Sequence, residues 1–172
     1  MVCPSRFFYL LVMHSSLPIR SVKELIAWAR ARPGEMTYAT PGVGSPVQLG
    51  QELFNSIVGV KMSHIPYKGG GASLTDLATG RVQESFLTTL TAINLARQGS
   101  VRALAVSGPR RLESVPDVPT VAEAGVPDFE MGNAYGLFTR TGAAPAIIEA
   151  VNREVHQLLT QPESRSRLAA DG

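Results

Sequence analysis

A loop at residues 40–45, with the sequence Thr-Pro-Gly-Val-Gly-Ser, has the residue types that bind anions in proteins. Its glycines let the backbone turn sharply and bring N–H groups close to a ligand. The helix expected after the loop begins with unpaired N–H groups and a partial positive charge. The sequence therefore predicts a carboxylate or phosphate site formed by Thr40, Gly42, Gly44 and Ser45. A tight strand-to-helix joint, with Ser45 as an ordinary N-cap, explains the same pattern equally well.

A second loop, at residues 64–71, reads His-Ile-Pro-Tyr-Lys-Gly-Gly-Gly and also leads from an expected strand into a helix. Tyr67 offers a hydroxyl group and a ring face, Lys68 a positive charge, and Gly69 a backbone that can approach a ligand closely. Taken singly, Lys68 is more often a solvated surface charge, and Tyr67 fits a packing role as well as a contact. Open α/β sheets bind ligands beyond the carboxyl ends of their strands, so we expect the two loops to share one site.

Catalytic and metal-binding patterns are weak in this sequence. His14, His64 and His156 have no spacing typical of metal ligands, and Cys3 is the only cysteine. Ser45 lacks the Gly-x-Ser-x-Gly pattern of a hydrolase nucleophile, and neither loop matches a Walker or dinucleotide-binding pattern. We therefore expect no catalysis, no cofactor and no metal. A hydrolase that uses Ser45 and His64 is the less favoured alternative.

The elements that position these loops follow from hydrophobic periodicity. A capping box of Ser21 and Glu24 starts a helix that Pro33-Gly34 ends. Strands are expected at Phe7–Met13, Met36–Thr40, Lys61–Ile65, Val82–Leu87 and Arg102–Val106. Because helices separate the later strands, the pattern predicts an α/β fold with a mainly parallel sheet. The helix after the first loop is expected to bury Leu49, Leu53, Phe54 and Ile57.

After Gly108 the sequence becomes rich in proline and in loops. Thr120 and Glu123 fit a local helical cap. A strand is expected at Tyr135–Phe138, and Pro162 is expected to open a final short helix. Between them, a long helix has an apolar face formed by Ile147, Ile148, Val151, Val155, Leu158 and Leu159.

Composition narrows the classes of function. The chain carries 16 basic and 14 acidic residues, for a formal net charge of +2, and they are spread along its length. Without a basic patch, binding to nucleic acid has no support. The apolar run Phe7–Met13 is too short to span a membrane, and no small-residue cleavage site follows it. We therefore expect neither membrane insertion nor a signal peptide within these residues.

Five short motifs occur in order, and together they are specific. They are Thr-Pro-Gly-Val-Gly-Ser-Pro (40–46), His-Ile-Pro-Tyr-Lys-Gly (64–69), Asp-Leu-Ala-Thr-Gly (76–80), Arg-Ala-Leu-Ala-Val (102–106) and Asp-Val-Pro-Thr-Val-Ala-Glu-Ala-Gly (117–125). From about Leu11 to Gly172 the chain resembles the Bug family, the periplasmic substrate-binding receptors of tripartite tricarboxylate transporters. The resemblance implies a periplasmic-binding-protein type II-like α/β fold, whose two lobes close on a small organic acid or amino acid. It also implies a periplasmic location and transfer of the ligand to the membrane subunits of the transporter.

The resemblance also assigns positions to a ligand site. It places the first loop in contact with the ligand and Tyr67, Lys68 and Gly69 at the border of the same cleft. Thr88 and Thr89, which follow the strand expected at Val82–Leu87, would line the pocket.

The family pattern begins with a further segment that has no counterpart here, so the resemblance implies a fragment. Residues 14–128 would form a nearly complete ligand-binding lobe. Residues 1–13 and 129–172 would supply the crossing strands and the C-terminal part of the second lobe. A truncated gene product without binding activity is the alternative to a receptor.

Overall fold

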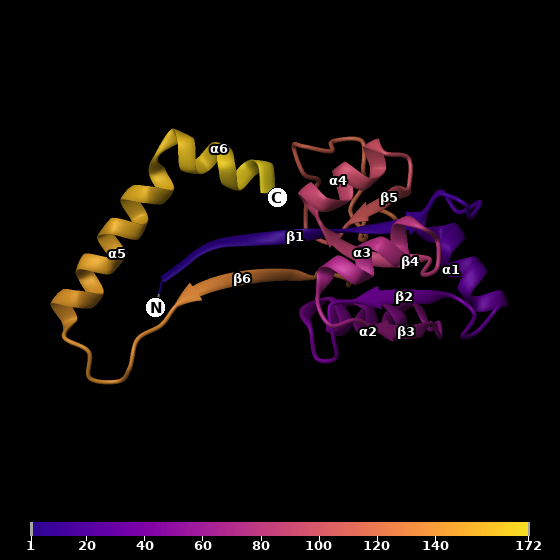
Figure 1. Ribbon diagram of the computed structural model, residues 1–172, viewed down its shortest axis with the longest axis horizontal. Coiled ribbons are helices and arrows are strands. Elements are labelled where there is room, and N and C mark those ends of the chain that lie inside the picture. Colours follow the sequence, from indigo (N-terminus) through magenta and orange to yellow (C-terminus); the bar gives the residue numbers. More distant parts are fainter. Residues whose placement is uncertain (1, 172) are drawn as a thin grey trace.

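The computed structural model describes residues 2–171, which form a body at one end and two helices at the other, joined by two long strands (Figure 1). The strands are β1 (Val2–His14), β2 (Thr37–Thr40), β3 (Ser63–Pro66), β4 (Glu84–Thr88), β5 (Val101–Val106) and β6 (Gly132–Leu137). The helices are α1 (Val22–Ala31), α2 (Pro46–Val58), α3 (Gly70–Ala78), α4 (Thr89–Arg97), α5 (Pro145–Thr160) and α6 (Pro162–Asp171). The expected alternation of strands and helices is therefore present through β5.

The sheet of the body is mixed rather than mainly parallel, which corrects the expectation from sequence. Its order is β3-β2-β4-β1-β5, with β2 parallel to β3 and β4. The strand β1 runs antiparallel between β4 and β5, so that Leu11 faces Phe86 on one side and Ala105 on the other. Residues 10–13 of β1 are apolar at every position and fully buried, as a central strand covered on both faces requires.

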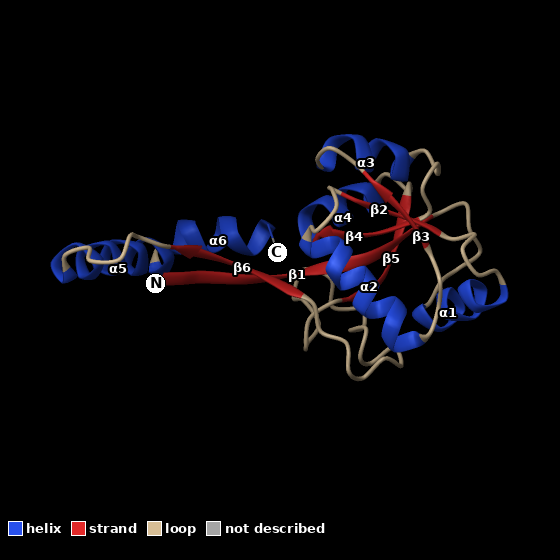
Figure 2. Ribbon diagram, turned by 90° about the horizontal axis from the view of Figure 1, so that it is seen from below, coloured by secondary structure: helices blue, strands red, loops and turns tan. Residues whose placement is uncertain are grey.

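The strand β1 belongs to two parts of the molecule. Its second half lies in the body sheet, whereas its first half pairs antiparallel with β6. In this second pairing Phe7 is opposite Asn133 and Ser5 is opposite Tyr135. The resulting two-stranded ribbon runs from the body toward α5 and α6 (Figures 1 and 2). We call this pairing the β1–β6 ribbon.

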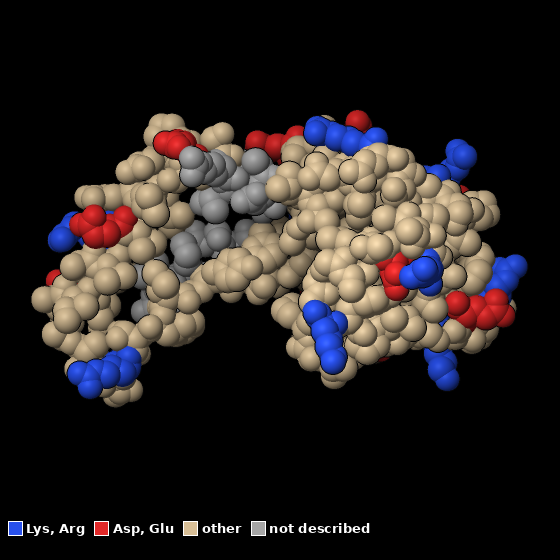
Figure 3. All heavy atoms as spheres, in the orientation of Figure 1, with Lys and Arg blue, Asp and Glu red and all other residues tan. Residues whose placement is uncertain are grey.

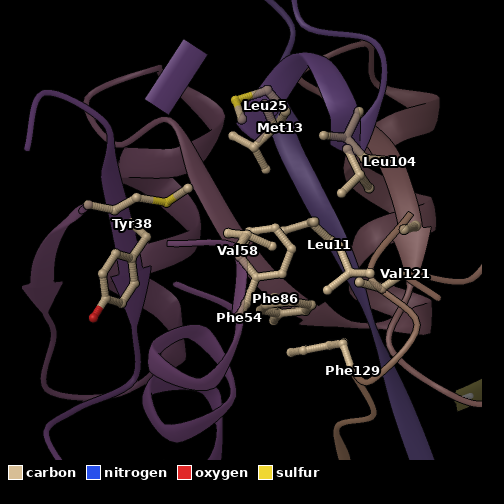
Figure 4. Close-up of a cluster of buried hydrophobic side chains, with 14 of the residues drawn as sticks. Leu11, Met13, Leu25, Tyr38, Phe54, Val58, Phe86, Leu104, Val121 and Phe129 are labelled. Atoms are coloured by element: carbon tan, nitrogen blue, oxygen red, sulfur yellow. The ribbon is translucent and has the colours of Figure 1, made fainter. Parts of the chain in front are cut away.

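The core consists of two clusters, one on each face of the sheet. Leu11 and Met13 point to the face covered by α1 and α2, where Phe54, Phe86 and Phe129 pack together (Figure 4). The alternate residues of β1 point to the other face, against α3 and α4. The period of two along a strand explains how one apolar strand supplies both clusters.

The first two helices begin as the sequence predicts, with side-chain caps. The Ser21 hydroxyl oxygen accepts a hydrogen bond from the Glu24 N–H (3.2 Å), and the Glu24 carboxylate accepts one from the Arg20 N–H (2.6 Å). Ser45 caps α2 by accepting a hydrogen bond from the Gln48 N–H at 3.3 Å. The local cap expected at Thr120 is also present, because its hydroxyl and the Glu123 carboxylate bond each other's backbone N–H groups.

The buried face of α2 differs from the expectation. Leu49, Leu53 and Ile57 are exposed, and of the four predicted core residues only Phe54 is buried. The helix instead turns a face containing Gly50 toward Met131, so closely that a Cβ atom at this glycine would lie 1.9 Å from the methionine sulfur. The close approach at a residue without a side chain fixes the rotation of the helix.

The helix α5 forms as predicted, but none of its residues is fully buried. Ile147, Val151 and Leu158 are 60%, 42% and 54% exposed. No helix of the described chain has both the length and the hydrophobicity needed to cross a membrane. Charged side chains are scattered over the face seen in Figure 3 rather than gathered in one patch.

Candidate functional site

A cavity of about 310 Å³ lies where the parallel strands of the body end and the β1–β6 ribbon begins. Its walls come from the loop after β2, the first turns of α2, α3 and α4, strand β4, and strands β1 and β6. The lining residues are Phe7, Tyr9, Pro41, Ser45, Pro46, Val47, Gly70, Ser73, Leu74, Ser85, Phe86, Leu87, Thr88, Thr91, Asn133 and Tyr135. This is the position at which open α/β sheets bind ligands. A larger hollow of about 450 Å³ between α1 and α2 contains none of the predicted site residues.

Three helices begin at this cavity, and two of them lack a side-chain cap. The Ser45 hydroxyl caps α2, but neither Gly69 before α3 nor Thr88 before α4 makes a side-chain cap hydrogen bond. The first backbone N–H groups of a helix have no partner within the helix. The starts of α3 and α4 therefore direct uncompensated donors and partial positive charge toward the cavity.

The two glycine loops meet, as expected from the sequence. The Tyr67 N–H donates to the Thr40 carbonyl oxygen at 3.0 Å, and the Gly69 N–H donates to the Pro41 carbonyl oxygen at 2.9 Å. These bonds extend the parallel pairing of β2 and β3 beyond the strand ends. Of the predicted site residues, Ser45 and Thr88 line the cavity.

Several backbone donors that the sequence assigned to a ligand are occupied within the loops. The Gly44 N–H donates to the Gln48 side-chain oxygen (2.6 Å), and the Ser45 N–H donates to the Gly42 carbonyl oxygen (3.3 Å). The N–H groups of Tyr67 and Gly69 are bonded as well. The first loop therefore shapes the cavity wall, while the free donors lie at the starts of α3 and α4.

Thr40 is buried and does not line the cavity. Its hydroxyl lies 2.6 Å from the Nε2 atom of His64, whose Nδ1 atom lies 3.3 Å from the Gln48 amide nitrogen. The His64 ring also stacks on Tyr38, with 4.9 Å between ring centroids. Because both ring nitrogens face these partners and neither contacts Ser45, the geometry gives no support to a Ser45–His64 nucleophile.

The remaining predicted residues lie around the cavity and do not line it. The Tyr67 hydroxyl donates to the Asp76 carboxylate at 2.8 Å, and burial together with this bond raises the pKa of Tyr67 to about 12. Lys68 is exposed. Thr89 is buried and donates from its hydroxyl to the Phe8 carbonyl oxygen at 3.5 Å.

Sequence reasoning missed the residues that complete the walls. Thr91 lies in the first turn of α4, with its hydroxyl oxygen 3.0 Å from that of Thr88. Its position three residues after Thr88 could have indicated that both side chains lie on the same side of the helix start. Phe7 and Tyr135 of the ribbon, and Tyr9 beside Thr88 in the body sheet, carried no comparable signal. They reach the cavity through the pairing of segments far apart in the chain.

The cavity has a largely apolar lining with a few hydroxyl and amide groups and no charged side chain among its described residues. None of the described residues that line it is Asp, Glu, Lys or Arg. The pKa of Tyr9 is raised above its ordinary value, because the effect of burial outweighs that of the hydrogen bond with Asn133, which lowers the pKa. An anion in this cavity would thus be held by hydroxyl groups, amides and helix starts.

Comparison with known proteins identifies relatives of this architecture. The family model described as "Tripartite tricarboxylate transporter family receptor" matches residues 5–172. The protein BugT of Bordetella pertussis (strain Tohama I) is 35% identical over 162 residues, which cover 94% of this chain and 50% of BugT. The chain thus spans about half the length of this relative.

Two solved structures align over nearly the whole chain. R. palustris Rpa4515 with adipate has a TM-score of 0.89 and 34% identity, covering 98% of this chain and 56% of that one. MatC (Rpa3494) from Rhodopseudomonas palustris with bound malate has a TM-score of 0.86 and 29% identity, and the alignment covers 97% of this chain and 57% of MatC. The resemblance and the periplasmic-binding-protein fold class expected from the sequence are confirmed. The chain belongs to the family of tripartite tricarboxylate transporter receptors.

Proposed function

We propose that this chain supplies one ligand-binding lobe and the crossing strands of a periplasmic receptor for a small organic acid. Residues 14–128, together with the second half of β1, correspond to the lobe, and the first half of β1 with residues 129–172 to the crossing strands and part of a second lobe. The receptor passes its ligand to the membrane subunits of a tripartite tricarboxylate transporter and catalyses no reaction. Family membership supports this role, as do the relatives whose structures contain adipate and malate.

The observation that carries the proposal is the pair of uncapped helix starts at one cavity. A helix start carries about half a positive elementary charge, together with N–H groups that need acceptors. The space in front of α3 is open, because a Cβ atom at Gly69, Gly70 or Gly71 would meet nothing within 4 Å. A carboxylate at this position would accept hydrogen bonds from the start of α3 and from Thr88 or Thr91 at the start of α4.

The substitution Thr88→Asp tests this site, because it separates binding from folding. An aspartate at this N-cap accepts hydrogen bonds from the first turn of α4 and stabilises the helix, by about 0.5–1 kcal/mol. The same carboxylate occupies the donors and repels a second anion. We expect the variant to unfold at a higher temperature and to lose at least about tenfold in affinity for malate and adipate at neutral pH, measured by titration calorimetry.

The control is Asn94→Asp, which adds the same charge at an exposed residue of α4 that does not line the cavity. This variant should keep the affinity of the unmodified chain. Equal losses in both variants would contradict a specific site at the start of α4. If the unmodified chain binds neither acid, the truncated product without binding activity is the correct interpretation.

A further inference from the structure

The β1–β6 ribbon presents aromatic rings to the cavity. The rings of Phe7 and Tyr135 are stacked, with 5.3 Å between their centroids and 29° between their planes. Phe7 also packs edge-to-face on Tyr9, at 5.4 Å and 60°. Tyr135 is 62% exposed although its ring belongs to the cavity lining. The stacked Phe7–Tyr135 pair therefore leaves aromatic surface in contact with water beside the cavity.

The other lining residues are of two kinds, those with hydroxyl groups and those with apolar side chains. The starts of α2, α3 and α4 contribute the hydroxyl groups of Ser45, Ser73, Thr88 and Thr91. The helices and β4 also contribute apolar side chains, among them Val47, Leu74 and Leu87. The Ser73 hydroxyl is already bonded to the Gly70 carbonyl oxygen at 2.7 Å. On β6, the Asn133 amide is hydrogen-bonded to the Tyr9 hydroxyl, so the helix starts supply most of the polar groups for a ligand.

We propose that the ligand is an acid with an apolar body, either an aryl group or an unsubstituted methylene chain, which lies against the Phe7–Tyr135 pair. This inference rests on the proposed function, since the helix starts hold the carboxylate. Apolar surface gains free energy when it covers the exposed rings. A body rich in hydroxyl groups would lose its hydrogen bonds to water against the same rings and find few replacements. The walls therefore select for a carboxylate on an apolar body and against a compact polyhydroxylated acid.

Adipate and galactarate provide a matched pair of ligands. Both are six-carbon diacids, and galactarate differs by a hydroxyl group on each of its inner carbons. We expect the 172-residue chain to bind adipate at least about tenfold more tightly than galactarate at neutral pH, measured by titration calorimetry. The carboxylates are common to both acids, so the difference reports the walls around the ligand body.

Two aromatic variants then test whether the β1–β6 ribbon causes the preference for adipate over galactarate. Tyr135→Ala removes an exposed ring of the cavity wall and should reduce the preference for adipate to about threefold or less, with the affinity for galactarate changed by less than about twofold. Phe138→Ala removes a ring that is 78% exposed and does not line the cavity, and it should leave both affinities unchanged.

The outcomes distinguish this inference from the proposed function. Equal or tighter binding of galactarate would overturn the apolar-body ligand while leaving a carboxylate receptor in place. An undiminished preference for adipate in Tyr135→Ala would overturn the role of the ribbon. The absence of binding to either acid would overturn the proposed function itself, and the inference with it.

Discussion

Glu84 is a carboxyl group buried in the core of the body without a hydrogen-bond partner. It is fully inaccessible to solvent, and neither side-chain oxygen is bonded. Its neighbours across the sheet are Met13 on β1 and Tyr38 on β2. The Tyr38 hydroxyl already donates to Glu52. Because burial disfavours the ionised form, the pKa of Glu84 is raised well above its ordinary value of 4.5.

The raised pKa makes folding stability depend on pH, with a sign that can be worked out. Below pH 4.5 the group is protonated in both the folded and the unfolded chain, so its stabilising contribution is fully present. As the pH rises further, the unfolded chain releases this proton while the folded chain retains it. The free energy of unfolding then falls by up to about 1.4 kcal/mol per pH unit. The loss continues until the pH has passed the raised pKa of the folded state.

The substitution Glu84→Gln should remove this slope, because glutamine has nearly the same shape and does not ionise. We expect the variant to be more stable than the unmodified chain above the raised pKa, and the difference between them to shrink toward acidic pH. Urea unfolding followed by circular dichroism, from about pH 5 to about pH 8, measures both curves. Glu35→Gln, at an exposed position, is the control and should leave the slope unchanged. Parallel curves for Glu84→Gln and the unmodified chain would refute the buried, unpaired placement of Glu84.

Two further predictions concern close contacts and hydrogen bonds within the body. Gly80→Ala should destabilise the body more than Gly99→Ala. Both glycines have positive φ, so either substitution should lower the free energy of unfolding by about 1 kcal/mol. Only at Gly80 would the added Cβ atom also meet the His14 ring, at 2.8 Å. Thermal unfolding of the two variants compares them, and equal losses would argue against that contact. Ser107→Ala should cost about 2–4 kcal/mol, because its hydroxyl accepts from the Tyr9 N–H at 2.8 Å and donates to the Met131 carbonyl oxygen at 2.6 Å. A loss below about 0.5 kcal/mol in urea unfolding would show that these bonds contribute little.

Local signals in the sequence predicted the elements well. The pair Ser21 and Glu24 located the start of α1, and the glycine loops located the ends of β2 and β3. Such signals act between residues close in sequence, so the chain reveals them without knowledge of its fold. The insertion of β1 antiparallel between β4 and β5 has no local signal, since it depends on pairing between residues about 70 to 96 positions apart.

The face that α2 buries shows the limit of periodicity. Its sequence contains two apolar stripes, and the stripe with Leu49, Leu53 and Ile57 looks the more hydrophobic. The structure buries the other one, which includes the polar Gln51 and Asn55, because Gly50 allows Met131 to approach. The choice of which face of α2 is buried therefore depends on Met131, a residue distant in the chain.

The sequence predicted the location of the candidate site but not all of the groups that form it. The convergence of two glycine loops at the strand ends followed from the α/β pattern, and Ser45 and Thr88 line the resulting cavity. Which backbone donors remain free did not follow, because Gln48 and the facing loop occupy several of them. The aromatic wall also could not be foreseen, since it depends on the pairing of β1 with β6.

The most direct test of the account is a backbone-amide NMR titration of the chain with adipate and with malate. The saturable shifts should be largest at Gly70 and Gly71, at the start of α3, and at Leu90 and Thr91, at the start of α4. Shifts confined to the hollow between α1 and α2, with these four amides unchanged at saturation, would contradict the assignment of the carboxylate site.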